Sequence, residues 1–457
     1  MKKKVLATLL SAGMVCSALA GCGGSAGSTS TETAASTEAP AAEEAPAAND
    51  LAGTTIRFAW WGSQPRHEAT TKVVEQFMAE TGINVEYEFY DFNGYFTQLD
   101  TLAAADDVWD VFQMGNNWAQ YHEIIEPLNP YMESGAIDTT DISPAIVQVT
   151  QDYDGQQMGL SLGTNCRCLV YNPALFEQAG VAEPTDSWTW DDFKTASEQI
   201  IANTDAQYGM DKIEYMDIMT AACAQMGEGY NFFAMDGSDF AFKDDLSGIT
   251  KMFDIFGGMM KDGSIADPGV QNEITDEQAD YICTGKSAML MIPSNKFVAL
   301  SEACAANGVT LKLALLPKLT SSSQSGMLVR SSQMVSMAKS SKNKEAAAML
   351  IDYLVNNISA NEILNGERGV PANAKVLSAL AAKSDEITAQ MYEFVNKVGS
   401  IPDTKNTTNA EPAAQAEVKA TIQTYFERYY AGDFSTAADA AAAFYEEAKQ
   451  VFANYEG

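Results

Sequence analysis

Residues 54–118 alternate between strand-like and helix-like spacing of their apolar side chains. The run 55–60 is extended, apolar and rich in aromatic residues, which is typical of a buried strand. Val73 and Phe77 then recur at helical spacing, and residues 83–90 alternate apolar with polar side chains. This order predicts a strand-helix-strand unit, with the strands in one sheet.

A second unit of the same kind follows directly. Residues 95–102 predict a helix, and residues 109–114 predict a third strand that ends in a Gly-Asn-Asn-Trp loop. In open parallel sheets ligands bind outside the carboxyl ends of the strands, so we expect the three loops to face one crevice. These loops carry aromatic, amide and charged side chains that are candidate ligand contacts: Trp61, Gln64, Arg66, His67, Asp91, Tyr95, Asn116 and Trp118.

The remaining chain continues to mix strands with helices. An Asp-Gly pair between residues 147–153 and 156–162 predicts a hairpin, because Gly155 can take the positive φ that such a turn needs. Further strands are predicted at 163–171, 285–292 and 311–316, the last two buried. Further helices are predicted at 173–179, directly after the N-cap Thr189, within the Met-rich stretch 213–261, and at 276–283.

The amino terminus carries the signals of an exported lipoprotein. A basic head and an apolar core of about 15 residues are typical of a secretory signal and too short to span a membrane. Leu19–Cys22 resembles a bacterial lipobox, which implies cleavage of a signal peptide at 1–21 and acylation of Cys22. Multiple acyl chains would hold the protein at a membrane surface. The alternative is an ordinary secreted protein with a cysteine at this position.

Residues 22–51 predict a flexible tether. Between Gly23 and Asp50 the composition is Gly, Ser, Thr, Ala, Pro and acidic residues, with no large apolar side chain to bury. A flexible coil of this length reaches roughly 30 Å, enough to let a folded body turn above a bilayer. We therefore expect folding to begin near Leu51.

Length and charge narrow the class of protein. The folded part is too long for one hydrophobic core and long enough for two. The formal net charge is −33, and no cluster of basic residues offsets it, so an acidic surface should repel nucleic acid. Solvated acidic side chains are the ordinary explanation for such a balance.

Cysteine and histidine usage gives little support for a metal site or for catalysis. An odd number of cysteines remains after Cys16 and Cys22, which argues against a full disulfide framework. Cys166 and Cys168 resemble half of a metal site but lack a second pair, so we interpret them as small buried side chains. The two histidines, His67 and His122, lie in no catalytic motif. We expect no metal and no cofactor.

Several stretches, in chain order, carry a resemblance to a known family. The sequence is similar to the carbohydrate-binding extracellular solute-binding proteins of bacterial ABC importers, the group of maltose-binding protein. The resemblance spans residues 55–451, and relatives usually have proline where Val108-Trp109 stands. The supporting stretches are Phe58–Gly62, Asp110–Met114, Asp154–Gly159, Leu169–Gly180, Trp188–Phe193, Gly285–Met291, Ser341–Ala347 and Glu367–Pro371.

The resemblance implies an α/β, two-lobed periplasmic-binding-protein-like fold. Each lobe is expected to hold a mostly parallel sheet flanked by helices, with a helical carboxyl-terminal tail. The implied first lobe comprises 52–163 plus 309–350, and the second 164–308 plus 351–457. The chain is expected to cross between them near Asn165 and Pro293.

Aromatic side chains at strand ends suit sugars, because the flat C–H face of a pyranose lies on a ring while its hydroxyls reach polar groups at the edges. Trp61, Tyr95 and Trp118 could stack in this way, as could Tyr230. A solvated loop or lobe packing is the alternative for each candidate. To the polar candidates of the first loops we add Asn165, Arg167, Asn295 and Arg368.

These observations predict a lipid-anchored, monomeric, extracellular protein that binds an oligosaccharide or sugar derivative between its lobes and delivers it to the transmembrane permease subunits. No enzymatic step is expected. An anchored glycoside hydrolase remains an alternative, because it needs two carboxylates and the chain has 61 acidic residues. The same fold with a peptide or polyamine ligand is another.

Overall fold

The computed structural model describes residues 51–115, 117–152, 154–227, 231–234, 239–273, 281–406, 412 and 414–454. These residues belong to one compact unit. The predicted signal peptide, the acylation of Cys22 and the tether lie outside the described residues, as does most of the helix expected at 276–283.

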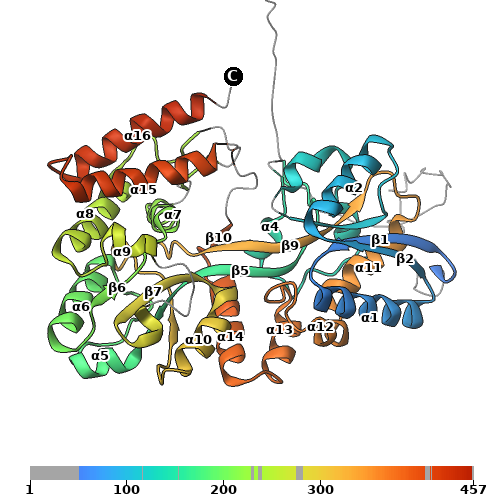
Figure 1. Ribbon diagram of the computed structural model, residues 1–457. Helices are drawn as coiled ribbons and strands as arrows, with labels where there is room; N and C mark the ends of the chain where they lie inside the picture. The colour runs from blue at the N-terminus through green and yellow to red at the C-terminus, as the bar shows by residue number, and fades with distance from the viewer. Residues whose placement is uncertain are drawn as a thin grey trace, which may run out of the picture. The chain divides into compact units, whose positions relative to one another are not determined.

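Within the described residues, ten strands form one mixed sheet (Figure 1). Seven strands follow one another in the order β2-β1-β3-β9-β5-β7-β6, while β4 and β10 pair with β9 and β8 pairs with β5. The strands are β1 (Thr55–Trp61), β2 (Asn84–Tyr90), β3 (Val111–Met114), β4 (Ile125–Glu126), β5 (Leu160–Tyr171), β6 (Tyr208–Met210), β7 (Ser287–Pro293), β8 (Lys312–Ala314), β9 (Leu328–Ala338) and β10 (Lys405–Asn406).

The strand-helix-strand prediction for the first part of the chain is confirmed. β1 pairs in parallel with β2, from Thr55 opposite Asn84 to Trp61 opposite Tyr90, and it pairs in parallel with β3 on its other side. The helix between β1 and β2 ends at Gly82, whose φ of 74° only glycine adopts without strain. The carboxyl ends of the three strands therefore lie at one edge of the sheet.

Two long strands join the two ends of the sheet. β5 has 12 residues, and its first half pairs antiparallel with β9 from Leu160 opposite Val335 to Cys166 opposite Val329. From Arg167 onwards β5 pairs instead with β7 and β8. In Figure 1 the pair runs between the helices around β1 and β2 and those around β6 and β7. The fold class is confirmed as α/β, with parallel pairs at both ends of the sheet and antiparallel pairs along β5 and β9.

Helices cover both ends of the sheet and form the carboxyl terminus. In chain order they are α1 (Gln64–Thr81), α2 (Phe92–Ala104), α3 (Asn129–Glu133), α4 (Pro144–Gln148), α5 (Pro173–Ala179), α6 (Trp190–Asn203), α7 (Tyr215–Gln225), α8 (Ser247–Asp262), α9 (Pro268–Glu273), α10 (Phe297–Ala305), α11 (Lys344–Asn356), α12 (Ile358–Leu364), α13 (Ala374–Ala381), α14 (Glu386–Ser400), α15 (Gln415–Ala431) and α16 (Ala437–Ala453), with short 3-10 helices η2 (Trp118–Ile124), η4 (Tyr281–Thr284) and η5 (Ser294–Lys296).

Local signals place several helix ends where the sequence predicts them. Thr189 caps α6 by accepting a hydrogen bond from the Asp192 backbone, and the Asp192 carboxylate accepts one in return, which makes a capping box. Pro173 opens α5 and Gly180 ends it at a φ of 70°. α15 and α16 pack against α8, so the predicted helical tail is confirmed.

Three expectations need correction. The hairpin is reduced to a single bridge between Gln151 and Gln157, because Ser143 and Pro144 start α4 where the first strand was expected. The helical pattern expected over the Met-rich stretch 213–261 holds only in part, because α7 ends at Gln225 and α8 begins at Ser247. The second crossing strand is β9, since β7 ends at Pro293 and leads into α10.

The large hydrophobic core is continuous from the β1 end to the β6 end of the sheet. α12 packs on α1 and on α11, although residues 351–457 were expected in the second lobe. The lobe boundaries therefore stay a prediction. None of the helices in the described ranges is long and apolar enough to cross a membrane.

Asp211 supplies a pH-dependent test of the packing between β6 and η4. Its Oδ2 accepts a hydrogen bond of 2.9 Å from the Tyr281 backbone, while its buried Oδ1 has no hydrogen-bond partner. Burial raises the pKa of Asp211 to about 6. The folded chain thus holds this proton more tightly than the unfolded chain, and stability is lost as pH rises from about 4 to about 6.

We expect Asp211→Asn to remove the loss of folding stability that accompanies ionisation of the Asp211 carboxyl group. The free energy of unfolding of D211N minus that of wild type should be about 2–3 kcal/mol larger at pH 7 than at pH 4, as measured by urea denaturation. Asp205→Asn, at an exposed position nearby in the chain, is the control and should show no such difference. Equal effects of D211N at both pH values would contradict the prediction.

Candidate functional site

A cavity of about 230 Å³ lies where β5 changes partners from β9 to β7. Antiparallel pairing places Asn165 of β5 opposite Arg330 of β9, and places Arg167 opposite Pro293 at the end of β7. Of the predicted ligand residues, Asn165, Arg167 and Asn295 line this cavity. The complete lining is Asn165, Cys166, Arg167, Asp217, Thr220, Ala221, Pro293, Asn295, Leu316, Gly326, Leu328, Arg330, Ser331 and Ser332.

An ion pair forms one wall of the cavity. The Arg167 Nε lies 2.9 Å from Asp217 Oδ2, with 8% of the Asp217 side chain exposed and 28% of the Arg167 side chain. Burial raises the pKa of Asp217, and the positive charges of Arg167 and Arg330 oppose that shift. Asp217 comes from the first turn of α7, where a negative charge also interacts favourably with the helix dipole.

The Asn165 amide and the Cys166 thiol are two further polar groups of residues that line the cavity. Asn165 Oδ1 is buried and has no hydrogen-bond partner among the described residues, so it is an unsatisfied acceptor of a residue that lines the cavity. Burial raises the pKa of the Cys166 thiol to about 12, which keeps it neutral and unreactive. The cavity therefore offers hydrogen-bonding groups and an ion pair rather than a nucleophile.

A second cavity, of about 470 Å³, is lined by residues of α12, α13, α14 and the loop around Gly366. Asn295 lines both cavities. An ion pair between Lys383 and Glu362 lies at this second cavity.

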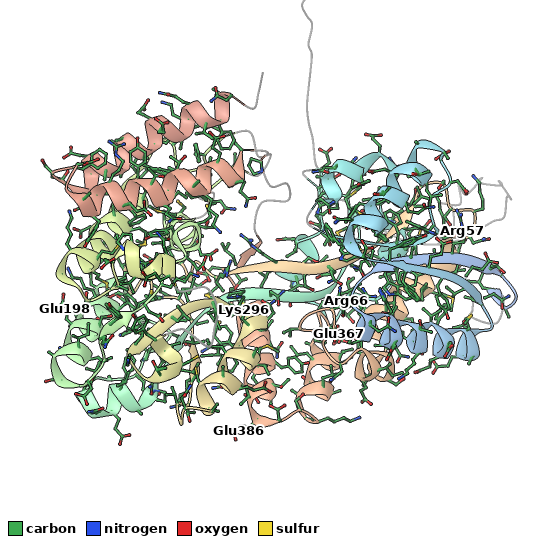
Figure 2. The ribbon with its side chains drawn as sticks, viewed as in Figure 1. Arg57, Arg66, Glu198, Lys296, Glu367 and Glu386 are labelled. Atoms are coloured by element: carbon green, nitrogen blue, oxygen red, sulfur yellow. The ribbon has the colours of Figure 1, made fainter. Side chains whose placement is uncertain are left out.

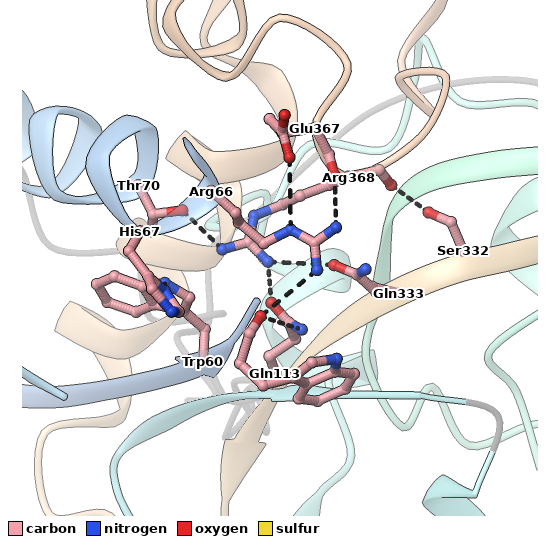
Figure 3. Close-up of polar contacts among 10 residues, drawn as sticks. Trp60, Arg66, His67, Thr70, Gln113, Ser332, Gln333, Glu367 and Arg368 are labelled. Atoms are coloured by element: carbon pink, nitrogen blue, oxygen red, sulfur yellow. Dashed lines mark hydrogen bonds and ion pairs between the residues drawn. The ribbon is translucent and has the colours of Figure 1, made fainter. Parts of the chain in front are cut away.

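Arg66 and Arg368 lie together in a polar cluster beside the crossing strands (Figure 3). The Arg368 guanidinium donates to Gln113 Oε1 and, at 2.8 Å, to Thr70 Oγ1. Arg66 donates to the Glu367 carbonyl at 2.8 Å, and its Nε lies 4.0 Å from the Glu367 carboxylate. Figure 2 shows these two residues close together beside β1. Burial, together with the charge of Arg66, lowers the pKa of Arg368 to about 9.

The same cluster holds His67 and reaches the crossing strands. His67 Nδ1 accepts a hydrogen bond of 3.2 Å from the Trp60 indole, and burial lowers the pKa of His67. Ser332 donates to the Arg368 carbonyl and, at 2.9 Å, to the Gly163 carbonyl. The segment at Arg368 is therefore fastened directly to β5 and β9.

Trp61, Tyr95 and Trp118 pack together in a second hydrophobic cluster, with exposed fractions of 8%, 0% and 5%. Phe92 contacts the Trp61 ring edge-on at a centroid distance of 5.6 Å and is 56% exposed. Near the carboxyl ends of β1 and β2, the exposed aromatic rings are thus Phe92 and Phe89, which is 45% exposed, and the sequence argument selected neither as a ligand contact.

The other candidates lie at separate places. Gln64 is exposed and donates to Glu68, and Asp91 caps α2 by accepting from the Gly94 backbone at 2.9 Å. Asn116 and Tyr230 lie outside the described residues. Neither cavity is lined by Arg368 or by any described candidate from the first three loops. Their role as ligand contacts stays a prediction.

Sequence reasoning missed several cavity residues: Asp217, Thr220, Arg330, Ser331 and Ser332. Asp217 lies in a helix with packing-rich composition, and the serines lie on a strand with no recognisable motif. The pairing of β5 with β9 brings Arg330 and the two serines near Asn165, whereas Asp217 and Thr220 reach the cavity from α7. Within the described ranges, no group of three or more His, Cys, Asp or Glu residues could hold a metal ion.

Comparisons with known proteins agree with this architecture. Residues 72–393 match the family model of bacterial extracellular solute-binding proteins. A binding protein of Brucella abortus is 26% identical over 316 residues, which cover 66% of this chain and 72% of that protein.

Solved structures match over most of the chain. The extracellular solute-binding protein family 1 from Alicyclobacillus acidocaldarius gives a TM-score of 0.76 at 21% identity and covers 88% of this chain and 99% of that one. A periplasmic oligogalacturonide binding protein from Yersinia enterocolitica gives 0.74 at 22% identity, with 88% and 100% covered. At these identities the matches show the fold, which is the predicted periplasmic-binding-protein-like one.

The contact between Trp61 and Phe92 allows a direct comparison of a buried and an exposed ring. Trp61→Ala should lower the free energy of unfolding by about 3–5 kcal/mol, because it leaves a cavity in the aromatic cluster. Phe92→Ala, its matched control, should cost less than about 1 kcal/mol, because its ring already faces solvent. Chemical denaturation measures both, and equal losses would show that the two rings are not differently buried.

Proposed function

This chain belongs to the bacterial extracellular solute-binding protein family, and from that premise we propose that it is the carbohydrate-binding subunit of an ABC importer. It would capture an oligosaccharide or sugar derivative outside the cell and deliver it to the transmembrane permease subunits. Micromolar affinity, about −8 kcal/mol, suffices for capture and still allows release.

The observation that carries this proposal is the polar cavity at the strand crossing. Its walls combine an unpartnered amide oxygen from Asn165, an Arg167–Asp217 ion pair and the side chains of Thr220 and Ser331. Sugar hydroxyls both donate and accept, so they match such a mixed set better than a ligand that only donates or only accepts. The cavity is smaller than the ~300–1,000 Å³ typical of drug-sized ligands and suits one sugar unit of a longer chain.

The relatives support a carbohydrate ligand. The Yersinia enterocolitica protein with the same fold is described as binding an oligogalacturonide. A polyamine is a weaker candidate, because Arg167 and Arg330 both line the cavity and would repel a cationic ligand.

Closure of two lobes on the ligand is part of the proposal. The crossing of β5 at Asn165 is the natural hinge between a first lobe of 52–163 plus 309–350 and a second lobe of 164–308 plus 351–457. A ligand shifts an open-closed equilibrium only by its differential affinity for the two states. The proposed contacts on the second lobe, Arg167 and Asn295, line the same cavity as Arg330 of the proposed first lobe, so a ligand that contacts both sets would favour closure.

A hydrolytic role has less support. Glycoside hydrolases use a pair of carboxylates on either side of the scissile bond. Among the described residues that line the cavity, Asp217 is the one carboxylate, and Arg167 already pairs with it. We therefore propose binding without catalysis.

A panel of neutral and acidic oligosaccharides, followed by titration calorimetry, tests the ligand class. We expect one sugar to bind wild type, and Asn165→Ala and Asp217→Asn to weaken binding roughly 10- to 100-fold through loss of buried hydrogen bonds. Asp205→Asn, an acidic residue at an exposed position, should bind as wild type does.

The other outcomes of this experiment are equally clear. Heat from peptides or polyamines but from no sugar would overturn the ligand class. New reducing ends in a labelled oligosaccharide incubated with the protein would replace binding with hydrolysis. Unchanged affinity in both cavity variants would move the site elsewhere.

We further propose that Cys22 carries the lipid anchor and that residues 22–51 tether the folded body to the membrane. Cys22→Ser should abolish metabolic labelling with radioactive palmitate and release the protein into the medium, because a signal peptide alone leaves no attachment. Cys16→Ser, within the proposed signal peptide, is the control and should label as wild type does. Labelling of C22S equal to wild type would exclude Cys22 as the acylated residue.

A further inference from the structure

Two buried cysteines that no functional argument uses lie in contact. The Cys304 thiol lies 3.0 Å from Cys283 Sγ, and both side chains are fully buried. Cys283 belongs to η4 and Cys304 to α10, two elements that pack directly against each other.

The surrounding structure holds both thiols in place. η4 is fixed by the hydrogen bond from the Tyr281 backbone to Asp211, and by one of 2.8 Å from Lys286 to the Tyr281 carbonyl. The end of α10 is fixed because the Val309 backbone donates to the Cys304 carbonyl at 3.0 Å. A covalent S–S bond measures about 2.05 Å, so closing the present contact requires the sulfurs to move together by only about 1 Å.

We propose that Cys283 and Cys304 form a structural disulfide in the exported protein. The two thiols lose two protons and two electrons as the S–S bond forms. The electrons reduce the disulfide of a thiol-disulfide oxidant, which is released as a dithiol. The export signal expected at the amino terminus would bring the chain into a compartment where such oxidants act.

The bond would close a loop that contains part of the candidate site. Between Cys283 and Cys304 lie β7, η5 and most of α10, including Pro293 and Asn295 of the cavity. Closing this loop restricts the unfolded chain and thereby stabilises the folded one. Because both sulfurs are buried, the bond should also resist small reductants. Formation of this disulfide does not depend on which ligand the protein binds.

Proteolysis under non-reducing conditions tests the proposal on the wild-type chain. The protein is reduced, refolded in a buffer of reduced and oxidised glutathione, alkylated after denaturation and digested with trypsin. Residues 262–286 contain Cys283 as their one cysteine, and residues 297–312 contain Cys304 as theirs. We expect these two peptides to be linked, lighter by two hydrogen atoms than their sum, and to separate on reduction.

Variants and a stability measurement sharpen the result. The linked peptide should vanish in Cys283→Ser and in Cys304→Ser and persist in Cys223→Ser, the matched control at another buried cysteine. The melting temperature of oxidised wild type should exceed that of the reduced form by several degrees, and neither single variant should show this difference. Full alkylation of both cysteines in the refolded wild type, or linkage of either one to another cysteine, would overturn the proposal.

Discussion

The antiparallel pairing of β5 with β9 is the constraint on which the rest of the structure depends. It brings residues 160–166 beside residues 329–335 and thereby joins the parallel strands β2, β1 and β3 to β7 and β6. The approach is close: a Cβ on Gly163 would lie 2.2 Å from the Arg368 carbonyl oxygen. Only glycine permits this contact, and the hydrogen bond of 2.7 Å from the Thr164 backbone to the Val370 carbonyl depends on it. The cavity exists because this pairing sets Asn165 against Arg330.

Arg368 extends that constraint into the first strands of the sheet. Burying a guanidinium is costly unless its donors are satisfied. Here Gln113 of β3 and Thr70 of α1 accept from the terminal nitrogens of Arg368, while its Nε is buried without a hydrogen-bond partner. The nearby charge of Arg66 opposes the burial further. The Arg368 side chain thus binds β3 and α1, and its backbone carbonyl accepts a hydrogen bond from Ser332 of β9, so this residue links those two elements to the crossing strands. This arrangement accounts for the position of Arg368 without requiring contact with a ligand.

Local chemistry made the first half of the fold and several helix ends predictable. The helix between β1 and β2, the start of α5 and the capping box at Thr189 all depend on residues within a few positions of one another. The candidate site depends on contacts between segments 50 or more residues apart, such as Arg167 with Asp217. The spacing of apolar residues along the sequence does not predict a contact between such distant segments. Aromatic side chains posed a different problem, since a ring at a strand end has the same sequence signature whether it packs, as Trp61 does, or faces solvent, as Phe92 does.

The cavity lining contains polar groups that the chain itself does not fully satisfy. Asn165 Oδ1 is buried without a partner, and an unsatisfied buried acceptor costs about 1–3 kcal/mol. Asp217 is also buried, and its single strong partner, Arg167, lies at the cavity wall with its guanidinium partly exposed. A hydroxyl-bearing ligand that donates to Asn165 and accepts from Arg167 would relieve the first cost and strengthen the second interaction by excluding water. In the proposed binding mode, these incompletely satisfied polar groups would supply part of the binding free energy. They lie where β5 changes partners from β9 to β7, on the strand that connects the two ends of the sheet.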